Sequence, residues 1–158
     1  MTERKDASQK FSDAAARQGL AVEITNMAES TRTAEEAAAA CGCQVAQIVK
    51  SLVFRGATSD APYLLLVSGA NRVNQKGVAT AIGEALVRPD AGDVRALTGY
   101  AIGGIPPLGH AQPLKTYMDV DLLAHDRVWA AAGRPNSVFA ADPERLASVT
   151  GAVVITVT

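Results

Sequence analysis

One lysine lies in the middle of an otherwise apolar stretch of the chain. The segment AQIVKSLVFRG, residues 46–56, reads as a buried β-strand, and Lys50 lies near its centre. Because side chains alternate between the two faces of a strand, Lys50 shares its face with Ile48, Leu52 and Phe54. The spacing leaves two interpretations open. Either the lysine stem follows the core and its ammonium reaches water, or this face lines a cleft where the ammonium meets a substrate group.

A second segment combines three glycines with two adjacent prolines. GGIPPLG, residues 103–109, carries its prolines in the middle, and its glycines are Gly103, Gly104 and Gly109. Prolines stiffen the backbone, and glycines let a ligand approach main-chain amides, which can bind an oxyanion or a nucleobase edge. A rigid connector that covers an edge of the core has the same composition, so both interpretations stay open.

The composition is that of an ordinary globular protein. The 158 residues, 48% hydrophobic and 20% charged, suffice for one core without disulfides or metals, and we expect a single domain over residues 1–158. The apolar runs are too short to span a membrane and the polar start, MTERKDASQK, does not resemble a secretory signal, so a cytoplasmic protein is expected. The net charge of −1 argues against binding long stretches of DNA or RNA, but not against contacting the end of a nucleic acid.

The cysteines and histidines do not suggest a metal site. Cys41 and Cys43 form a C-x-C pair that is poorly placed for an ordinary disulfide, and only His110 and His125 are available as further zinc ligands. We expect the cysteines to be packing residues, with a redox or metal role as the alternative. P-loop, dinucleotide-binding, G-x-S-x-G and H-E-x-x-H motifs are all missing from the sequence. The sequence therefore predicts neither a metal nor a cofactor.

Helix-like and strand-like segments are interspersed along the chain. Apolar spacing and capping residues, among them the capping box of Thr33 and Glu36, predict helices at 6–19, 31–41, 74–85, 89–99 and 143–151. Apolar or alternating runs predict strands at 20–25, 46–56, 63–69, 116–120, 127–133, 137–142 and 152–157. The connections mix hairpins and crossovers, which favours a mixed α/β (α+β) fold with a largely antiparallel central sheet flanked by helices.

Three segments together resemble the YbaK/ProX family, the free-standing relatives of the editing domain inserted in bacterial prolyl-tRNA synthetases. They are VKSLVF at 49–54, TGYAIGGIPPLG at 98–109 and AAAGRPNS at 130–137. The resemblance spans nearly the whole chain, and the strand lysine combined with a G-x-x-x-P-x-G loop is its specific part. It implies a trans-acting deacylase that hydrolyses the ester between a wrong amino acid and the terminal adenosine of tRNA, chiefly tRNA for proline. The implied partners are the acceptor end of an aminoacyl-tRNA and a prolyl-tRNA synthetase.

The resemblance also assigns roles to residues. Lys50 matches the essential lysine of the family, and Gly103 begins the loop whose backbone is thought to hold the ester carbonyl and the terminal nucleotide, so these two are the expected catalytic residues. The expected substrate-binding positions in that loop and in a late glycine–basic turn are Gly104, Pro107, Gly109, Gly133 and Arg134.

Several positions depart from the family pattern. Relatives that remove cysteine often read G-G-x-S-P-x-G, whereas Pro106 replaces the serine here, which argues against cysteine without naming a replacement. Asn71 lies where an aspartate is frequent. Arg72 is retained and either meets RNA phosphate or is a solvated loop residue. Met27 falls where relatives place a residue of the amino-acid pocket, although it could equally belong to the core.

An activated ester needs little chemical assistance: a positioned water, a group that holds the carbonyl, and exclusion of the correct amino acid. Family members lack a protein general base, so the charge of Lys50 is its useful property, and His110 has at most a minor expected role. Basic residues that could form a local rim for RNA, or simply a solvated surface, are Arg72, Lys76, Arg95, Lys115 and Arg134. Two other functions remain open, a non-catalytic RNA-binding or regulatory module and a hydrolase of another small acyl ester.

Overall fold

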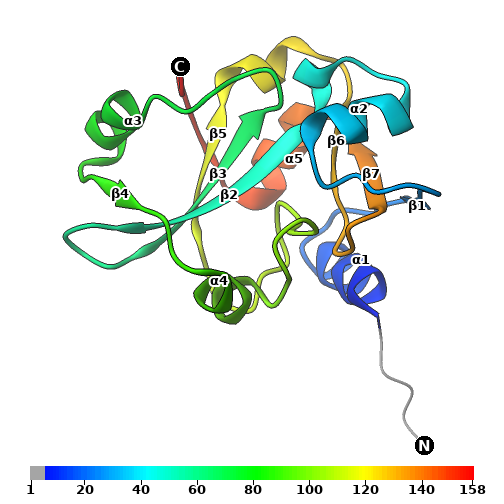
Figure 1. Cartoon of the computed structure of the whole chain (residues 1–158), viewed down its shortest axis with the longest axis horizontal. Coiled ribbons are helices and arrows are strands. Elements are labelled where there is room, and N and C mark those ends of the chain that lie inside the picture. The colour runs from blue at the N-terminus through cyan, green and yellow to red at the C-terminus, as the bar shows by residue number, and fades with distance from the viewer. Residues whose placement is uncertain (1–5) are drawn as a thin grey trace, which may run out of the picture.

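The strand predicted around Lys50 forms one half of a long antiparallel hairpin. In the computed structural model, which describes residues 6–158, β2 (Val49–Gly56) pairs with β3 (Pro62–Ser68) and Lys50 lies opposite Val67. Figure 1 shows this twisted ribbon crossing the molecule, with its turn at one end and α2 near the other. The predicted hairpin is therefore confirmed.

The strands form two sheets, which confirms the mixed α/β fold class. The larger sheet has the order β4-β2-β3-β5-β8, and its other strands are β4 (Leu86–Val87), β5 (Lys115–Asp119) and β8 (Val153–Ile155). The smaller sheet has the order β1-β7-β6 and consists of β1 (Ile24–Asn26), β6 (Val128–Ala131) and β7 (Ser137–Ala141). The smaller sheet is antiparallel throughout, whereas β5 pairs in parallel with both β3 and β8.

Polar caps and glycines set the limits of the helices. They are α1 (Ala7–Arg17), α2 (Ala34–Cys41), α3 (Gln75–Ile82), α4 (Ala91–Thr98) and α5 (Pro143–Thr150), with short 3₁₀ turns at Val45–Gln47 and Val120–Ala124. Thr33 caps α2 as predicted, because its hydroxyl accepts the amide of Glu36 at 3.1 Å. The predicted helix 74–85 ends earlier, at Ile82, because Gly83 adopts a left-handed conformation.

Several predicted strands are shorter than expected, since 46–56 begins only at Val49 and 152–157 is reduced to Val153–Ile155. The segment 20–25 pairs only from Ile24 onward, where β1 meets β7. Leu20 instead closes the end of α1, and its amide donates to the carbonyl of Ala15 at 2.9 Å. Its side chain is buried in the core, so the apolar character that predicted a strand belongs to a helix terminus.

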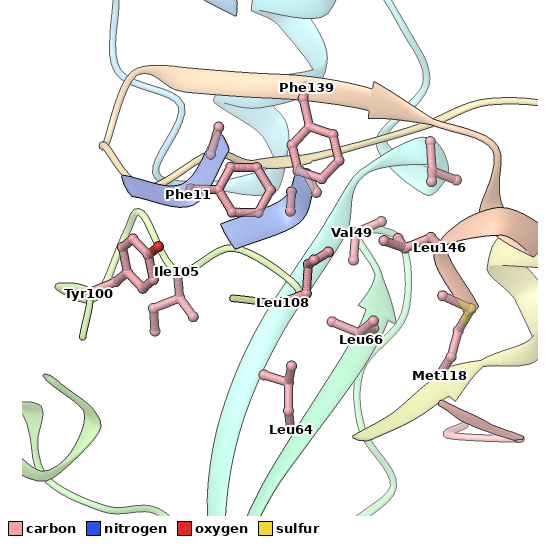
Figure 2. Close-up of a cluster of buried hydrophobic side chains, with 14 of the residues drawn as sticks. Phe11, Val49, Leu64, Leu66, Tyr100, Ile105, Leu108, Met118, Phe139 and Leu146 are labelled. Carbon is pink, nitrogen blue, oxygen red and sulfur yellow. The ribbon is translucent and has the colours of Figure 1, made fainter. Parts of the chain in front are cut away.

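Both faces of the hairpin are covered. Val49 and Val53 face one cluster of buried side chains, in which Figure 2 shows Phe11 of α1 and Phe139 of β7 next to each other. Phe54 faces a second cluster on the opposite side of the sheet. A side chain in the middle of β2 therefore reaches water only along the edge of the strand. Within residues 6–158 no helix has the length and apolar character that a membrane span requires.

Candidate active site

A cleft opens along the free edge of β2. On that side β2 pairs with β4 only at Arg55 and Gly56, so no described strand continues the pairing over residues 50–53. The cleft has a volume of about 260 Å³. Its walls are β2, the turn that leads into α2, strand β6, and the loop that contains Ile102 and Gly103. The turn, β6 and the loop, which are far apart in the sequence, thus meet at the edge of β2.

Lys50 and Gly103 both line this cleft. Lys50 is half-buried, and its Nζ donates to the carbonyl oxygen of Asn71 at 2.6 Å. Burial lowers the pKa of Lys50, while the carboxylate of Glu35 opposes this shift and the guanidinium of Arg72 adds to it. The ammonium thus lies at the border of the apolar cleft, partly removed from water.

The conformation of the glycine–proline loop leaves no room for side chains at its start. Gly103 has a φ of +98°, and a Cβ there would lie 3.2 Å from Cγ of Arg32. Gly104 is in backbone contact with the late turn, because its carbonyl accepts the amide of Gly133 at 2.9 Å. A Cβ on Gly104 would lie 2.9 Å from the carbonyl carbon of Gly133. Sequence positions 103–104 and 133 are therefore adjacent, although Gly104 and Gly133 do not line the cleft.

The end of the same loop faces away from the cleft. Pro107, Gly109 and His110 line a separate hollow. Gly109 has a φ of +78°, and a Cβ there would lie 2.9 Å from Cβ of Ala14 in α1. His110 Nε2 lies 2.7 Å from the carbonyl oxygen of Pro106, and burial lowers its pKa. This part of the loop packs on α1, and the imidazole is engaged inside the loop.

The remaining predicted site residues do not line the cleft. Met27 is half-buried, and its amide donates to the carbonyl of Asn136 at 2.7 Å. Arg72 is exposed next to Asn71, whose carbonyl contacts Lys50. Arg134 is exposed, with its guanidinium 3.8 Å from a carboxylate oxygen of Asp6.

The basic residues proposed for an RNA rim do not form one group. Lys115 lies opposite Tyr63 at the start of β3, whereas Lys50 lies opposite Val67 near the end of that strand. The ammonium of Lys115 lies 5.7 Å from the ring centre of Tyr117. Lys115 therefore does not share a basic rim with Lys50 and its neighbour Arg72.

Three cleft residues had no role in the sequence-based prediction. Arg32 lies at the mouth of the cleft, where its aliphatic stem covers Gly103. Ser51 lines the cleft, and its hydroxyl oxygen is buried with no hydrogen-bond partner among residues 6–158. Trp129 of β6 forms part of the wall beside Ile48, with which it makes an isolated parallel bridge. Alternation placed Ser51 on the face opposite Lys50, and only an unpaired strand edge brings both to one cleft.

The cysteines lie behind one wall of the cleft. Cys43 packs against Ala37 and Ile48, and burial raises the pKa of Cys41 to about 11. A thiol with this pKa stays protonated at neutral pH and is a poor nucleophile or metal ligand. Within residues 6–158, His, Cys, Asp and Glu side chains form no group of three or more that could hold a metal ion.

Comparison with known proteins places this geometry in a family. The model of the aminoacyl-tRNA editing domain matches residues 28–149. The chain is 32% identical to YwhH of Bacillus subtilis (strain 168) over 124 residues, 78% of each protein. It is 28% identical over 123 residues to EbsC of Enterococcus faecalis (strain ATCC 700802 / V583), a candidate Cys-tRNA(Pro)/Cys-tRNA(Cys) deacylase. That match covers 77% of this chain and 74% of EbsC.

Solved structures agree with this placement. A crystal structure of a candidate trans-editing enzyme for prolyl-tRNA synthetase superimposes with a TM-score of 0.92 at 42% identity, covering 99% of both chains. The crystal structure of the hypothetical protein APE2540 has a TM-score of 0.86 at 31% identity, and the match covers 94% of this chain and 98% of that one. The matched residues 28–149 include the cleft lysine, the glycine–proline loop and the late glycine turn. The chain belongs to the aminoacyl-tRNA editing domain family.

Proposed function

We propose that the protein hydrolyses, in trans, the ester that links a mischarged amino acid to the terminal adenosine of tRNA for proline. Membership of the editing-domain family establishes the reaction class, an aminoacyl-tRNA deacylase. One observation carries the site assignment: Lys50 and Gly103 line the same largely apolar cleft. A cation and a glycine backbone that line one cleft suit recognition of an ester carbonyl, which needs positive charge or hydrogen-bond donors.

Lys50 acts through its charge. Water attacks the ester carbonyl, the carbonyl oxygen gains negative charge, and the bond to the ribose oxygen then breaks to give the free amino acid and tRNA. An ammonium at the border of an apolar cleft stabilises this charge, or a phosphate or ribose oxygen of the substrate, more strongly than one in open water. In this scheme Lys50 acts as a cation, because its amine is not the proton acceptor.

The proton of the attacking water goes to a group outside the protein. His110 is held against the carbonyl of Pro106 and lies in another hollow, so it is poorly placed to act as a general base. We therefore assign proton transfer to the ribose hydroxyl next to the ester, assisted by solvent. The leaving ribose oxygen takes up a proton as the products separate.

The other predicted residues divide into two groups. Arg72, with the additional residue Arg32, is proposed to contact phosphates of the acceptor end, since both are exposed beside Lys50 or Gly103. Asn71 holds Lys50 through its carbonyl. The residues proposed to shape the loop and the turn, instead of contacting substrate, are Gly104, Pro107, Gly109, Gly133 and Arg134. Met27 lies outside the cleft wall, which favours a packing role.

The choice of tRNA follows from the relatives. The names of EbsC and of the trans-editing structure both refer to the proline system. We therefore propose tRNA for proline as substrate, a prolyl-tRNA synthetase as the enzyme whose errors are corrected, and the cytoplasm, where translation takes place, as the location. A near-neutral net charge suits a protein that handles only the acceptor end.

The test is a deacylation assay with a panel of tRNAs for proline charged with alanine, cysteine, serine or proline. We expect turnover of at least one mischarged species, little turnover of the prolyl species, and loss of turnover in a Lys50→Ala variant. Binding of tRNA without turnover of any member would contradict the enzyme and favour an RNA-binding module. Equal turnover by wild type and Lys50→Ala would contradict the site assignment alone.

A further inference from the structure

A buried carboxylate lies behind the cleft lysine. Asp119, at the end of β5, is only 1% exposed. Its Oδ2 accepts the amide of Ser68 at 3.1 Å and the side-chain amide of Asn71 at 2.8 Å, and its Oδ1 accepts the amide of Asp121 at 3.0 Å. Burying a carboxylate costs several kcal/mol unless hydrogen bonds and a nearby cation compensate. The position of Asp119 is therefore fixed by its environment.

Asn71 connects this carboxylate to Lys50. Its side-chain amide bridges two acids, donating to Asp119 Oδ2 and to Asp121 Oδ2 at 2.8 Å each. Its backbone carbonyl accepts the Lys50 ammonium at 2.6 Å. The aspartate that relatives often carry at this position would bring a third carboxylate to the same place. The amide of Asn71 instead satisfies both acids and fixes the carbonyl that holds the lysine.

We propose that Asp119 is a positioning residue for deacylation: through Asn71 it fixes the carbonyl that holds the Lys50 ammonium at the border of the cleft. This inference rests on the proposed function of Lys50. Asp119 contacts the end of β3 through Ser68 and the following loop through Asn71, so one carboxylate sets both the strand end and the loop. A substrate-holding cation needs such a support, because small displacements weaken its interaction with developing charge.

The charges around Lys50 come from three elements. Glu35 lies in the first turn of α2, Arg72 follows Asn71 in the loop after β3, and Asp119 ends β5. Burial lowers the pKa of Lys50, Glu35 raises it, Arg72 lowers it, and Asp119 raises it. The positioning role thus has an electrostatic consequence, since loss of the Asp119 charge lowers the Lys50 pKa further.

The experiment compares Asp119→Asn with Asp93→Asn, which removes a carboxylate from the remote hairpin end. In Asp119→Asn we expect kcat for the best substrate to fall about tenfold with little change in KM, because a charge-assisted support is lost. The alkaline limb of the pH–rate profile is expected to move to lower pH by about one unit. NMR of the lysine side chains, with the Lys50 signal assigned by a Lys50→Arg variant, is expected to show that the pKa of Lys50 falls by the same amount as the alkaline limb moves. Asp93→Asn is expected to change none of these.

A second variant separates support from charge. Asn71→Ala keeps the backbone carbonyl and the Asp119 charge but removes the link between them, so we expect kcat to fall while the Lys50 pKa moves less than in Asp119→Asn. An unchanged Lys50 pKa together with unchanged kcat in a folded Asp119→Asn protein would overturn the proposal. If Asp119→Asn does not fold, unchanged kcat in Asn71→Ala would overturn it. The NMR titration does not need deacylase activity, so the proposed function and this inference can fail separately.

Discussion

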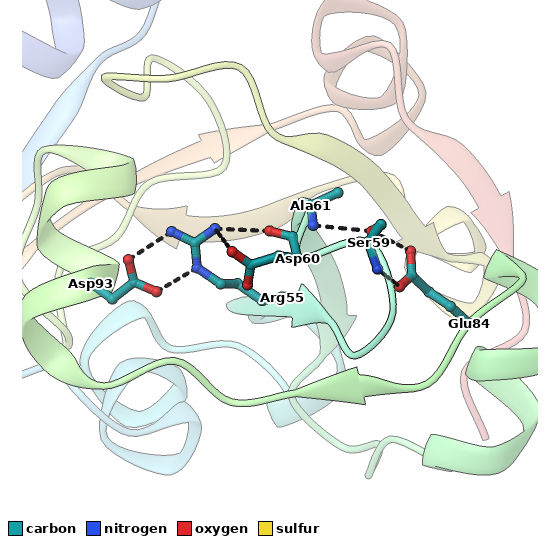
Figure 3. Close-up of polar contacts among 6 residues, drawn as sticks. All are labelled: Arg55, Ser59, Asp60, Ala61, Glu84 and Asp93. Atoms are coloured by element: carbon teal, nitrogen blue, oxygen red, sulfur yellow. Dashed lines mark hydrogen bonds and ion pairs between the residues drawn. The ribbon is translucent and has the colours of Figure 1, made fainter.

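The charged side chains at the two ends of β2 have different hydrogen-bond partners. At the hairpin end, Arg55 donates from Nε and Nη2 to both carboxylate oxygens of Asp93 at 2.6 and 2.8 Å, and from Nη1 to the carbonyl of Asp60 at 2.8 Å (Figure 3). At the cleft end, Lys50 donates to the carbonyl of Asn71. Arg55 is held by a bidentate ion pair, whereas Lys50 is held by a neutral oxygen.

Neighbouring groups repeat the contrast. Near the hairpin turn, the carboxylate of Glu84 accepts hydrogen bonds from the amides of Thr58 and Ser59, the hydroxyl of Ser59 and the hydroxyl of Tyr63. In the cleft, the hydroxyl of Ser51 is buried without a partner among the described residues. The carboxylate of Glu84 is thus satisfied internally, whereas the hydroxyl of Ser51 is left available to a ligand.

This difference separates structural from functional charge. A bidentate arginine–carboxylate pair gives its hydrogen bonds to the fold and has few left for a ligand. A lysine in an apolar cleft, with a neutral partner and an unpaired hydroxyl beside it, keeps its charge for an incoming anion or carbonyl. The interpretation would be wrong if Arg55 were needed for deacylation or if Lys50 were needed for stability.

The largest expected effect is on catalysis by Lys50→Ala, compared with Arg55→Ala. We expect Lys50→Ala to lower kcat/KM by about a hundredfold or more, since it removes the cation that faces developing charge. Its thermal stability should be equal to or above that of the wild type, because a partly desolvated ammonium is removed. Single-turnover deacylation and thermal melting measure the two quantities.

Arg55→Ala is expected to show the reverse pattern. Its melting temperature should fall, because Asp93 loses its bidentate partner, while kcat/KM per folded molecule stays at the wild-type value. Deacylation that depended on Arg55, or a strongly destabilised Lys50→Ala, would show that the two ends are not divided as proposed.

The next effect in size concerns the backbone of the cleft, tested by Gly103→Ala. An L-residue at a φ of +98° costs about 1–2 kcal/mol, and the new methyl group would meet the stem of Arg32. We expect this loss of unfolding free energy together with a drop of about tenfold in kcat/KM, because the loop must shift away from the substrate. Denaturant unfolding and the deacylation assay measure both.

Gly151→Ala is the matched control. Gly151 has a φ of +66° at the end of α5, and nothing lies within 4 Å of the position of its missing Cβ. We expect Gly151→Ala to lose a similar amount of unfolding free energy to Gly103→Ala but to keep the wild-type kcat/KM. Equal activity of both variants would mean that the free backbone at Gly103 is not used in catalysis.

The sequence pointed to two residues of the candidate site but not to the way in which its parts meet. Lys50 and Gly103 were identified from residue types and a family resemblance, and they do share a cleft. The sequence did not indicate Ser51, because strand alternation describes the two faces of a sheet and says nothing about an unpaired edge. The positioning role proposed for Asp119 was not predicted either, since the sequence does not distinguish an acid with this role from one that only caps the following turn. The cap of α2 at Thr33, in contrast, was predicted correctly, whereas the end of α3 at Gly83 was missed.

A smaller effect is expected on the pH dependence of stability, through Glu84→Gln. Hydrogen bonds from Ser59 and Tyr63 hold the pKa of Glu84 at about 2, below its ordinary value of 4.5. Because the folded-state pKa is depressed, the carboxylate stabilises the fold above about pH 4.5, and this contribution is lost as the pH falls toward 2. We expect the wild type to melt higher than Glu84→Gln near pH 6 and the two curves to converge near pH 2. A constant difference from pH 6 to 2 would contradict the assignment, and activity at pH 7 should be unaffected by the substitution.

The smallest expected effect is on tRNA binding by Arg32→Ala. If Arg32 contacts one phosphate of the acceptor end, the plot of log affinity against log salt concentration should become less steep by about one. Trp129 is the only tryptophan and lies in the cleft wall, so its fluorescence reports binding of uncharged tRNA without a label. Arg95→Ala, which removes an exposed cation from α4 outside the cleft wall, is the control and should keep the wild-type slope. An equal change in both slopes would mean that Arg32 attracts tRNA only through the net charge of the protein. The contrast between the two ends of β2 would then apply to the interaction of Lys50 with the ester, and not to tRNA binding.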